Sequence, residues 1–514
     1  MTTMKRLFAL MLAVLMLCAV CIASAEETMY MITAPAAVEG VTHNYSIFQI
    51  FTGDLTTNAN GQTVLINVLW GKNGTGEFET SVEDSVMQAL QSLPAGSTDK
   101  EKLVEVMKYV NIDDNNAFKT VSSGNYVEVP AGYYLIKDQD KTLENVYDAH
   151  TLYIVEVVDD VPMVAKSTKP KVDKQVFDEP EDSENNAADG WGETADHAIN
   201  ETFQFKLIAT LKKDDHYAAY TTYKIVFNDT MSSELNFEKI VSVKINNADV
   251  SESNYRVEGP TNGQWTLTIP DILTACGQTV DLVNDGATVE VIYEAHLNKD
   301  AYVSTPEDKE LTDNNKNTVN LTYSNNPNWN GTGEYDGEMG KTPDDSVWVF
   351  TYDVEYEKHD DTNNPLAGAG FTLYAGETPI KLSLKEKKDS VDIYYVDPNG
   401  IIEQIETSAT GKFKIVGLDA GEYTLKETKT PDGYNTCDDL DVSIKAIHNE
   451  NNATMGASVE LTEEDSNEII INKKGATLPE TGGIGTTIFY IAGGVLVLLA
   501  VVLLVTKRRM GENN

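Results

Sequence analysis

Positive charge is scarce in this 514-residue chain, which has 39 Lys and Arg against 81 Asp and Glu and a net charge of -42 at pH 7. So acidic a surface repels phosphate groups, which argues against nucleic acid and anionic membranes as partners. The seven histidines are scattered, and no His-Glu-x-x-His, Gly-x-Ser-x-Gly or phosphate-loop motif occurs. No constellation therefore supports a hydrolase, and we expect no cofactor and no metal site.

Long apolar runs are also few, and one of them lies at the N-terminus. Lys5 and Arg6 precede an apolar run over residues 7–20, and a small-residue Ala-Ser-Ala site ends at Ala25. This order is typical of a secretory signal peptide, which we assign to residues 1–25.

Cysteine is scarce too, with four in the whole chain. Cys18 and Cys21 leave with the signal peptide, and the remaining Cys276 and Cys437 are far apart in the sequence. An exported chain of this length with at most one disulfide must be held together by something else.

The C-terminal end has three parts in a fixed order: a pentapeptide, an uncharged apolar run over residues 488–505, and a basic cluster. Eighteen apolar residues are just enough to cross a bilayer as a helix. The basic cluster keeps its end in the cytoplasm, so the bulk of the protein is predicted to lie outside the cell. The pentapeptide is Leu478, Pro479, Glu480, Thr481 and Gly482, and the cluster is Lys507, Arg508 and Arg509.

The mature chain, roughly 450 residues, predicts three domains of ordinary size. Short alternating strands between Asn, Asp and Gly turns predict a mostly β protein of three tandem immunoglobulin-like sandwiches. The expected domains are 26–165, 166–342 and 343–474, followed by a tail over 475–514 with a transmembrane helix. In the first domain, Val82, Val86 and Leu90 recur at helical spacing and predict a helical insertion.

Several polar residues have the same parity in the predicted strands as the apolar core residues. Side chains two residues apart in a strand point to the same face. The second and third sandwiches are therefore each predicted to bury one amine, one carboxyl and one carboxamide. These residues are Lys174, Asp229 and Asn317 in the second domain, and Lys358, Glu427 and Asn472 in the third.

Burial changes the chemistry of these groups, because an unpaired buried charge costs several kcal/mol. Burial lowers the pKa of a lysine and raises that of an acid, which favours a neutral amine beside a protonated carboxyl. The amine can then attack the asparagine carbonyl, ammonia leaves, and a Lys–Asn isopeptide bond remains. The alternative is an ordinary buried salt bridge with a hydrogen-bonded asparagine. Asn320 is the rival to Asn317 and fits only if its strand carries a bulge.

The motifs around these residues resemble those of sortase-assembled Gram-positive pilins. The stretch 423–434, which contains Glu427, resembles a CnaB-type domain, and the run 317–327 resembles the fimbrial isopeptide-forming domain. The resemblance implies that Glu427 and Asp229 catalyse the joining of lysine to asparagine in their domains.

The first domain departs from this pattern. Residues 131–138 match residues 420–427, which predicts a shared fold. However, Asp138 stands where the catalytic glutamate would be, and Gln49 stands where a bond-forming lysine would sit. We expect no isopeptide bond in this domain.

The tail resembles an LPXTG cell-wall sorting signal. The resemblance implies that a sortase cleaves after Thr481 and joins it to an amine of another subunit. A lysine near the end of the first domain would supply that amine: Lys166 fits best, with Lys171 and Lys169 as alternatives.

The implied protein is a major pilin and not an enzyme beyond its own crosslinking. Its partners would be a class C sortase and a housekeeping sortase, identical subunits joined head to tail, and peptidoglycan. It would lie in the cell wall and in an extracellular pilus that supports adhesion, and a host or matrix ligand is left open. The alternative is a monomeric wall-anchored adhesin or stalk.

Overall fold

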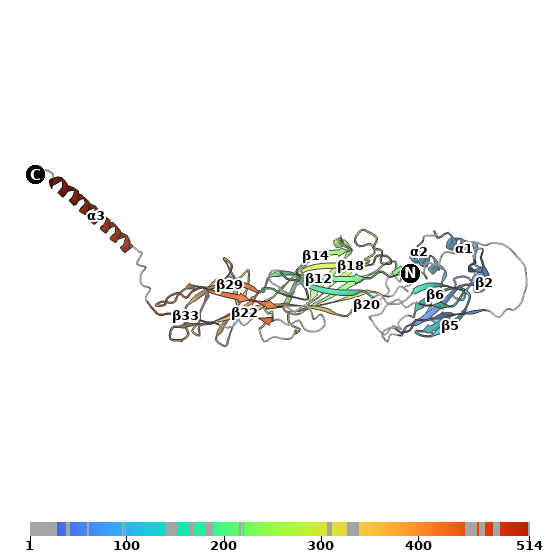
Figure 1. The fold of residues 1–514 in the computed structure, drawn as a ribbon. Coiled ribbons are helices and arrows are strands. Elements are labelled where there is room, and N and C mark those ends of the chain that lie inside the picture. The colour runs from blue at the N-terminus through green and yellow to red at the C-terminus, as the bar shows by residue number, and fades with distance from the viewer. Residues whose placement is uncertain are drawn as a thin grey trace, which may run out of the picture.

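The structure is a computed structural model, and Figure 1 shows successive β domains followed by a C-terminal helix. The described residues are 28–37, 42–58, 61–94, 97, 99–139, 152–163, 169–179, 189–214, 217–218, 220–305, 311–325, 339–447, 460–461, 468–475 and 484–511. The signal peptide and the pentapeptide lie outside these residues.

The first domain has a five-stranded sheet in which β3-β2-β6-β7 are neighbours and β4 pairs with β2, and a three-stranded sheet in the order β5-β1-β8. The five-stranded sheet contains β2 (Asn44–Thr57), β3 (Thr63–Trp70), β4 (Lys119–Ser122), β6 (Gly132–Asp138) and β7 (Leu152–Val157). The three-stranded sheet contains β1 (Met29–Thr33), β5 (Tyr126–Pro130) and β8 (Val161–Pro162).

The predicted helical insertion is confirmed and lies between β3 and β4. It consists of α1 (Asp84–Gln91), α2 (Asp99–Val106) and the short 3-10 turns Met107–Tyr109 and Asp114–Asn116. Phe48 and Leu135 pack with the insertion, whereas Ile47 and Ile136 pack in the cluster shared with the small sheet. Strands β2 and β6 are therefore covered on both faces.

The second domain is a sandwich of a six-stranded and a seven-stranded sheet. The six-stranded sheet has the order β10-β9-β12-β18-β14-β15, and the other has the order β11-β21-β19-β13-β17-β16 with β20 beside β19. The first sheet comprises β9 (Lys171–Phe177), β10 (Trp191–Gly192), β12 (Thr202–Leu211), β14 (Leu235–Ile245), β15 (Ala248–Asp249) and β18 (Ala287–Leu297). The second comprises β11 (Thr194–Asp196), β13 (Ile225–Met231), β16 (Arg256–Thr261), β17 (Gln264–Ile269), β19 (Lys316–Ser324), β20 (Met339–Lys341) and β21 (Asp345–Phe350), and the 3-10 turn Glu252–Asn254 precedes β16.

Strand β21 lies beyond the predicted domain boundary at residue 342, yet it belongs to the sheet of the second domain. It pairs antiparallel with β19 and parallel with β11. Its Val347 and Val349 are fully buried in the core of the second sandwich. The third sandwich therefore starts at Tyr352, because the backbone partners of β21 are all in the second.

The third domain has two five-stranded sheets, in the orders β25-β26-β28-β22-β33 and β24-β23-β29-β30 with β27 beside β23. The first contains β22 (Tyr352–Asp360), β25 (Leu382–Lys388), β26 (Val391–Val396), β28 (Lys412–Leu418) and β33 (Glu468–Asn472). The second contains β23 (Gly370–Ala375), β24 (Thr378–Pro379), β27 (Ile405–Glu406), β29 (Gly421–Lys429) and β30 (Leu440–Ile444), and a separate pair joins β31 (Ala446–Ile447) to β32 (Glu460–Leu461).

The repeated segment occupies β6 in the first domain and β29 in the third, and one contact is common to both. The hydroxyl of Tyr134 donates to the carbonyl of Pro130 at 2.7 Å, and that of Tyr423 donates to the carbonyl of Asp419 at 2.9 Å. Each tyrosine thus ties the start of its strand to the residue four positions earlier.

The C-terminal helix α3 (Ile484–Gly511) includes the run 488–505 that we predicted to cross a membrane. Among the residues that the structure describes, no helix is both long enough and apolar enough for a membrane span.

Candidate functional site

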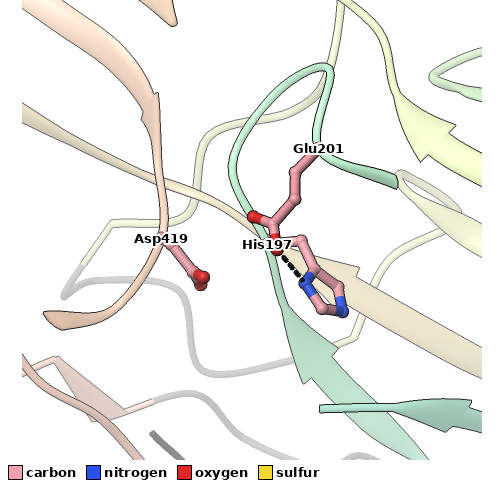
Figure 2. A group of neighbouring side chains, drawn as sticks. All are labelled: His197, Glu201 and Asp419. Carbon is pink, nitrogen blue, oxygen red and sulfur yellow. Dashed lines mark hydrogen bonds and ion pairs between the residues drawn. The ribbon is translucent and has the colours of Figure 1, made fainter. Parts of the chain in front are cut away.

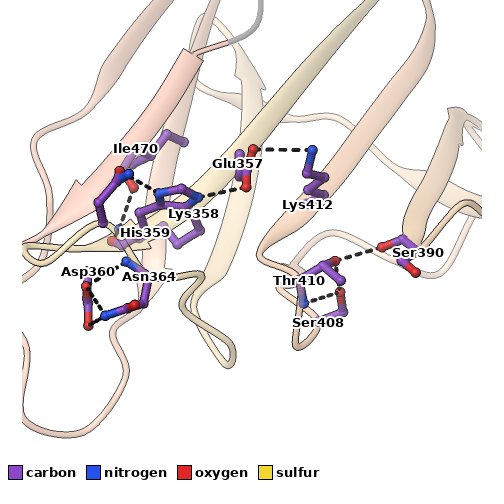
Figure 3. Close-up of polar contacts among 11 residues, drawn as sticks. Glu357, Lys358, His359, Asp360, Asn364, Ser390, Ser408, Thr410, Lys412 and Ile470 are labelled. Atoms are coloured by element: carbon purple, nitrogen blue, oxygen red, sulfur yellow. Dashed lines mark hydrogen bonds and ion pairs between the residues drawn. The ribbon is translucent and has the colours of Figure 1, made fainter.

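The site in the third domain lies between its two sheets. Lys358 is on β22 and Asn472 is on β33, and these strands run parallel with Lys358 opposite Ile470. Figure 3 shows Lys358 and Ile470 together where the two strands meet. Glu427 faces them from β29 in the other sheet. Lys358 and Asn472 are fully buried and Glu427 is 8% exposed, as the strand parity predicted.

Hydrogen bonds fix the carboxyl and the carboxamide of this site against each other. The Nδ2 of Asn472 donates to Oε1 of Glu427 at 2.7 Å, and the backbone N–H of Cys437 donates to Oε2 at 2.8 Å. The buried Oδ1 of Asn472 has no hydrogen-bond partner among the described residues. It is therefore available to a proton donor.

The amine of Lys358 donates to the backbone carbonyls of Ile470 at 3.2 Å and His359 at 3.4 Å. Burial lowers the pKa of Lys358, and the nearby Glu427 carboxylate opposes that shift without overcoming it. A lowered pKa means a larger neutral fraction, and the neutral amine is the nucleophilic form.

The loop after β22 is a turn. The Oδ1 of Asp360 accepts from the backbone N–H groups of Thr362 at 2.9 Å and Asn364 at 3.0 Å. These local bonds identify Asp360 as the residue that forms an Asx-type turn.

The site in the second domain also lies between two sheets. Lys174 comes from β9 in the six-stranded sheet, and Asp229 and Asn317 come from the neighbouring strands β13 and β19 in the other. In the register of these strands Asn317 lies opposite Met231, one side-chain repeat from Asp229. All three side chains are at most 1% exposed.

A fourth member of this site, Tyr293 on β18, was not predicted from the sequence. Its hydroxyl accepts from Lys174 Nζ at 2.9 Å and from Asn317 Nδ2 at 2.7 Å, and it donates to Asp229 Oδ2 at 3.0 Å. Lys174 Nζ also contacts Asp229 Oδ2 directly. The alternation of Val289, Val291 and Tyr293 identifies a strand, but a tyrosine at a core position gives no sign that its hydroxyl joins a polar group.

Burial moves both partners of the Lys174–Asp229 pair toward their neutral forms. It lowers the pKa of Lys174 and raises the pKa of Asp229, and in each case the attraction between the two groups opposes the shift without reversing it. The amine also lies 5.1 Å from the ring centre of Phe205 and 5.4 Å from that of Tyr293. Aromatic walls of this kind exclude water from the site.

The rival asparagine of the second domain points away from this site. The Nδ2 of Asn320 donates to Asp344 at 3.0 Å on the exposed side of β19. The register between β13 and β19 is continuous, so no bulge moves Asn320 to the inner face.

The first domain arranges its polar residues differently. Gln49 is buried and donates to the Tyr134 hydroxyl at 3.1 Å, and Asp138 contacts the Nδ1 of His43 at 2.9 Å. The sequence analysis missed Lys137, which is fully buried and forms an ion pair with Asp114 at 3.0 Å. Neighbours in a strand point to opposite faces, and both faces of β6 are covered, so Lys137 and Asp138 are both inside.

Of the linker lysines, Lys166 lies outside the described residues. Lys169 is partly buried, and Lys171 is exposed at the start of β9, where it pairs with Thr210.

Both described cysteines, Cys276 and Cys437, are free thiols. Burial, followed by the Glu427 carboxylate, raises the pKa of the Cys437 thiol to about 12.

Two families match the C-terminal part of the chain. Residues 352–460 match the SpaA prealbumin-like fold domain, and residues 470–510 match the LPXTG cell wall anchor motif. The trypsin-resistant surface T6 protein of Streptococcus pyogenes serotype M6 is 24% identical to this chain over 287 residues. The alignment covers 44% of this chain and 52% of the T6 protein, so the chain spans about half the length of that curated relative.

Solved pilin structures are similar to the chain over most of its length. The T6 backbone pilin of serotype M6 Streptococcus pyogenes has a TM-score of 0.47 and 16% identity, covering 88% of this chain and 100% of the pilin. The full-length major pilin SpaD of Corynebacterium diphtheriae has a TM-score of 0.43 and 16% identity, covering 88% and 98%.

The resemblance to Gram-positive pilins that the sequence predicted is confirmed by the matching SpaA domain, the anchor motif and the T6 relative. The anchor motif makes the chain a secreted protein that is attached to the cell wall.

Proposed function

We propose that this protein is a major pilin subunit, which a sortase polymerises through Thr481 and a linker lysine into a wall-anchored pilus. One observation carries the proposal. The second and third domains each bury a lysine, a carboxyl group and an asparagine together, and an LPXTG anchor motif follows them in the chain. As the alternative, the same sandwiches would form the stalk of a monomeric wall-anchored adhesin.

In the third domain, the neutral amine of Lys358 attacks Cγ of Asn472. The bond from Nζ to Cγ forms and the bond from Cγ to Nδ2 breaks, so that one ammonia leaves. Glu427 is within 2.7 Å of the Asn472 amide. The nitrogen and oxygen of an amide are assigned from their contacts, so a half-turn of this amide would let a protonated Glu427 donate to the carbonyl. Such an acid stabilises the developing oxyanion and carries the amine proton to the leaving nitrogen.

In the second domain, Asp229 has the catalytic role, and Lys174 and Asn317 form the bond. The raised pKa of Asp229 and the lowered pKa of Lys174 favour the required protonation states. The hydroxyl of Tyr293 contacts the Lys174 amine, the Asp229 carboxyl and the Asn317 amide. Tyr293 is therefore a positioning residue, because it holds the reacting groups together before the amine attacks.

The bonds would change how each sandwich carries tension. In the third domain Lys358 and Asn472 lie on the first strand and the last strand of the sandwich, side by side in one sheet. In the second domain the bond would join β9 to β19, and β20 and β21 follow β19 in the chain. A pull along the chain would pass through a covalent link and would no longer separate these strands.

Polymerisation is tested by the linker lysines. Replacing Lys166, Lys169 and Lys171 together with arginine keeps the charge and removes the amine nucleophile. A pilin then loses the high-molecular-weight ladder in boiled detergent extracts of the cell wall. The matched control replaces the exposed Lys212 and Lys213 with arginine and keeps the ladder. If wild-type wall extracts contain single subunits alone, the polymer proposal is wrong and the adhesin alternative takes its place.

A further inference from the structure

A cluster of one histidine and two carboxylates lies where the second domain meets the third. His197 and Glu201 are in the segment between β11 and β12, and Asp419 is in the turn between β28 and β29. One ligand atom from each residue lies within 4.8 Å of the others. Figure 2 shows the three side chains converging from the two domains.

The hydrogen bond on one side of the His197 ring fixes what the other side can do. Its Nε2 lies 2.8 Å from the carbonyl oxygen of Phe177, which can only accept, so Nε2 carries a hydrogen. In the neutral ring Nδ1 is then an acceptor, and it faces Oε1 of Glu201 at 3.4 Å. Two acceptors that face each other need a proton or a cation between them. Metal-binding histidines typically donate their second ring N–H to a carbonyl in this way.

Further buried polar groups surround the cluster. Asp178 and Asp196 are 2% and 0% exposed. The Tyr352 side chain is 1% exposed. Burial, followed by the negative charge of Asp196, Asp419 and Asp178, raises the pKa of Tyr352 well above its usual range. This buried hydroxyl and its negative surroundings favour a positive ion at the junction.

We propose that His197, Glu201 and Asp419 bind one divalent transition-metal cation of the zinc class, which links the second domain to the third. One imidazole nitrogen with carboxylate oxygens suits zinc, whereas calcium and magnesium prefer oxygen ligands alone. The site goes beyond pilus assembly and depends on neither crosslink. The sequence predicted no metal here, because Asp419 lies more than two hundred residues from His197 and Glu201.

The site would reinforce a joint that already has backbone contacts. The N–H of Ile199 donates to the carbonyl of Gly417 at 3.0 Å, and the side chain of Asn200 donates to the carbonyl of Val396 at 3.3 Å. A cation held by Glu201 and Asp419 adds a bond between the same two segments. Metal removal would therefore loosen the angle between the domains and leave each sandwich folded.

Isothermal titration of the metal-free mature ectodomain with zinc tests the site. We expect one zinc ion per chain, no competition from calcium or magnesium at equal concentration, and at least a tenfold loss of affinity in His197→Gln and in Asp419→Asn. The control Asp432→Asn changes an exposed carboxylate of the third domain and keeps wild-type affinity. Circular dichroism shows whether each variant is folded.

Cobalt supplies a second measurement, because its visible absorption reports nitrogen and oxygen ligands directly. The wild-type chain should give this absorption, and His197→Gln should lose it. Absence of zinc binding by the wild-type chain overturns the proposal and leaves a protonated His197–Glu201 ion pair at the junction. Wild-type affinity in both folded variants overturns it as well.

Discussion

Replacing Glu427 with glutamine would remove the proposed acid of the third domain with almost no change in shape. Glutamine can still accept the backbone N–H of Cys437, which Glu427 accepts at 2.8 Å. It cannot carry a proton between the amine and the amide. We therefore expect the Glu427→Gln ectodomain to retain the one ammonia that the wild type loses, once the mass change of the substitution itself is subtracted.

The same variant measures what the bond contributes to stability. A Lys358–Asn472 bond closes a loop of about 114 residues, and loop-closure entropy makes this worth about 5 kcal/mol at 25 °C. For a domain of this size, that free energy corresponds to roughly 20 °C in the melting temperature. In scanning calorimetry of the three-domain ectodomain, we expect one transition of the Glu427→Gln variant to lie about 20 °C below the corresponding transition of the wild type.

The matched control is Glu422→Gln on the same strand, where the side chain is exposed and bonds to Ser443. It should keep both the ammonia loss and the melting profile of the wild type. Complete ammonia loss in Glu427→Gln would show that Glu427 is not the catalyst. An unlinked variant with an unchanged melting temperature would refute the loop-closure argument.

Three further predictions concern other parts of the chain. Tyr293→Phe keeps the ring and removes the hydroxyl that contacts all three groups of the second site, so peptide mass spectrometry should show bond formation there slowed by at least tenfold, because the reacting groups lose their alignment. Burial, then Asp345 and Asp173, raises the pKa of Glu193 from 4.5 to about 7, so its stabilising contribution is full below pH 4.5 and is lost as the pH rises to 7. The melting temperature of the wild type should fall more steeply than that of Glu193→Gln across that window, and parallel curves would contradict the prediction. Thr481→Ala should block sortase cleavage, so that the chain keeps its C-terminal tail and is missing from cell-wall extracts; normal wall attachment would contradict the assignment.

The strand pattern alone was enough to predict that most of the proposed crosslinking residues are buried. Lys358, Asn472 and Asn317 each share strand parity with apolar residues two positions away, and each is fully buried. The pattern works because a strand of a sandwich has one inner face, so a polar residue in step with the apolar ones must be inside. It also separates Asn317 from Asn320, since the strand has no bulge.

The same rule fails where a strand is covered twice. Strand β6 packs against the small sheet on one face and the helical insertion on the other, so Lys137 is buried at the opposite parity to Tyr134. The sequence also left Tyr293 among ordinary core residues, because nothing local shows where its hydroxyl ends. The domain boundary moved for a related reason: β21 joins the sheet where its backbone partners are, beyond the predicted end of the domain.

By itself, the sequence determined the anchor motif, the β-sandwich class and most of the inward-facing polar side chains of the second and third domains, because each of these depends on residues close together in the chain. The tertiary structure alone decided which distant groups meet. It brought Tyr293 to Lys174, placed Glu427 2.7 Å from Asn472, and set His197 beside Asp419 at a domain junction. Such meetings depend on how separate sheets and domains pack, and no local pattern of residues specifies that packing.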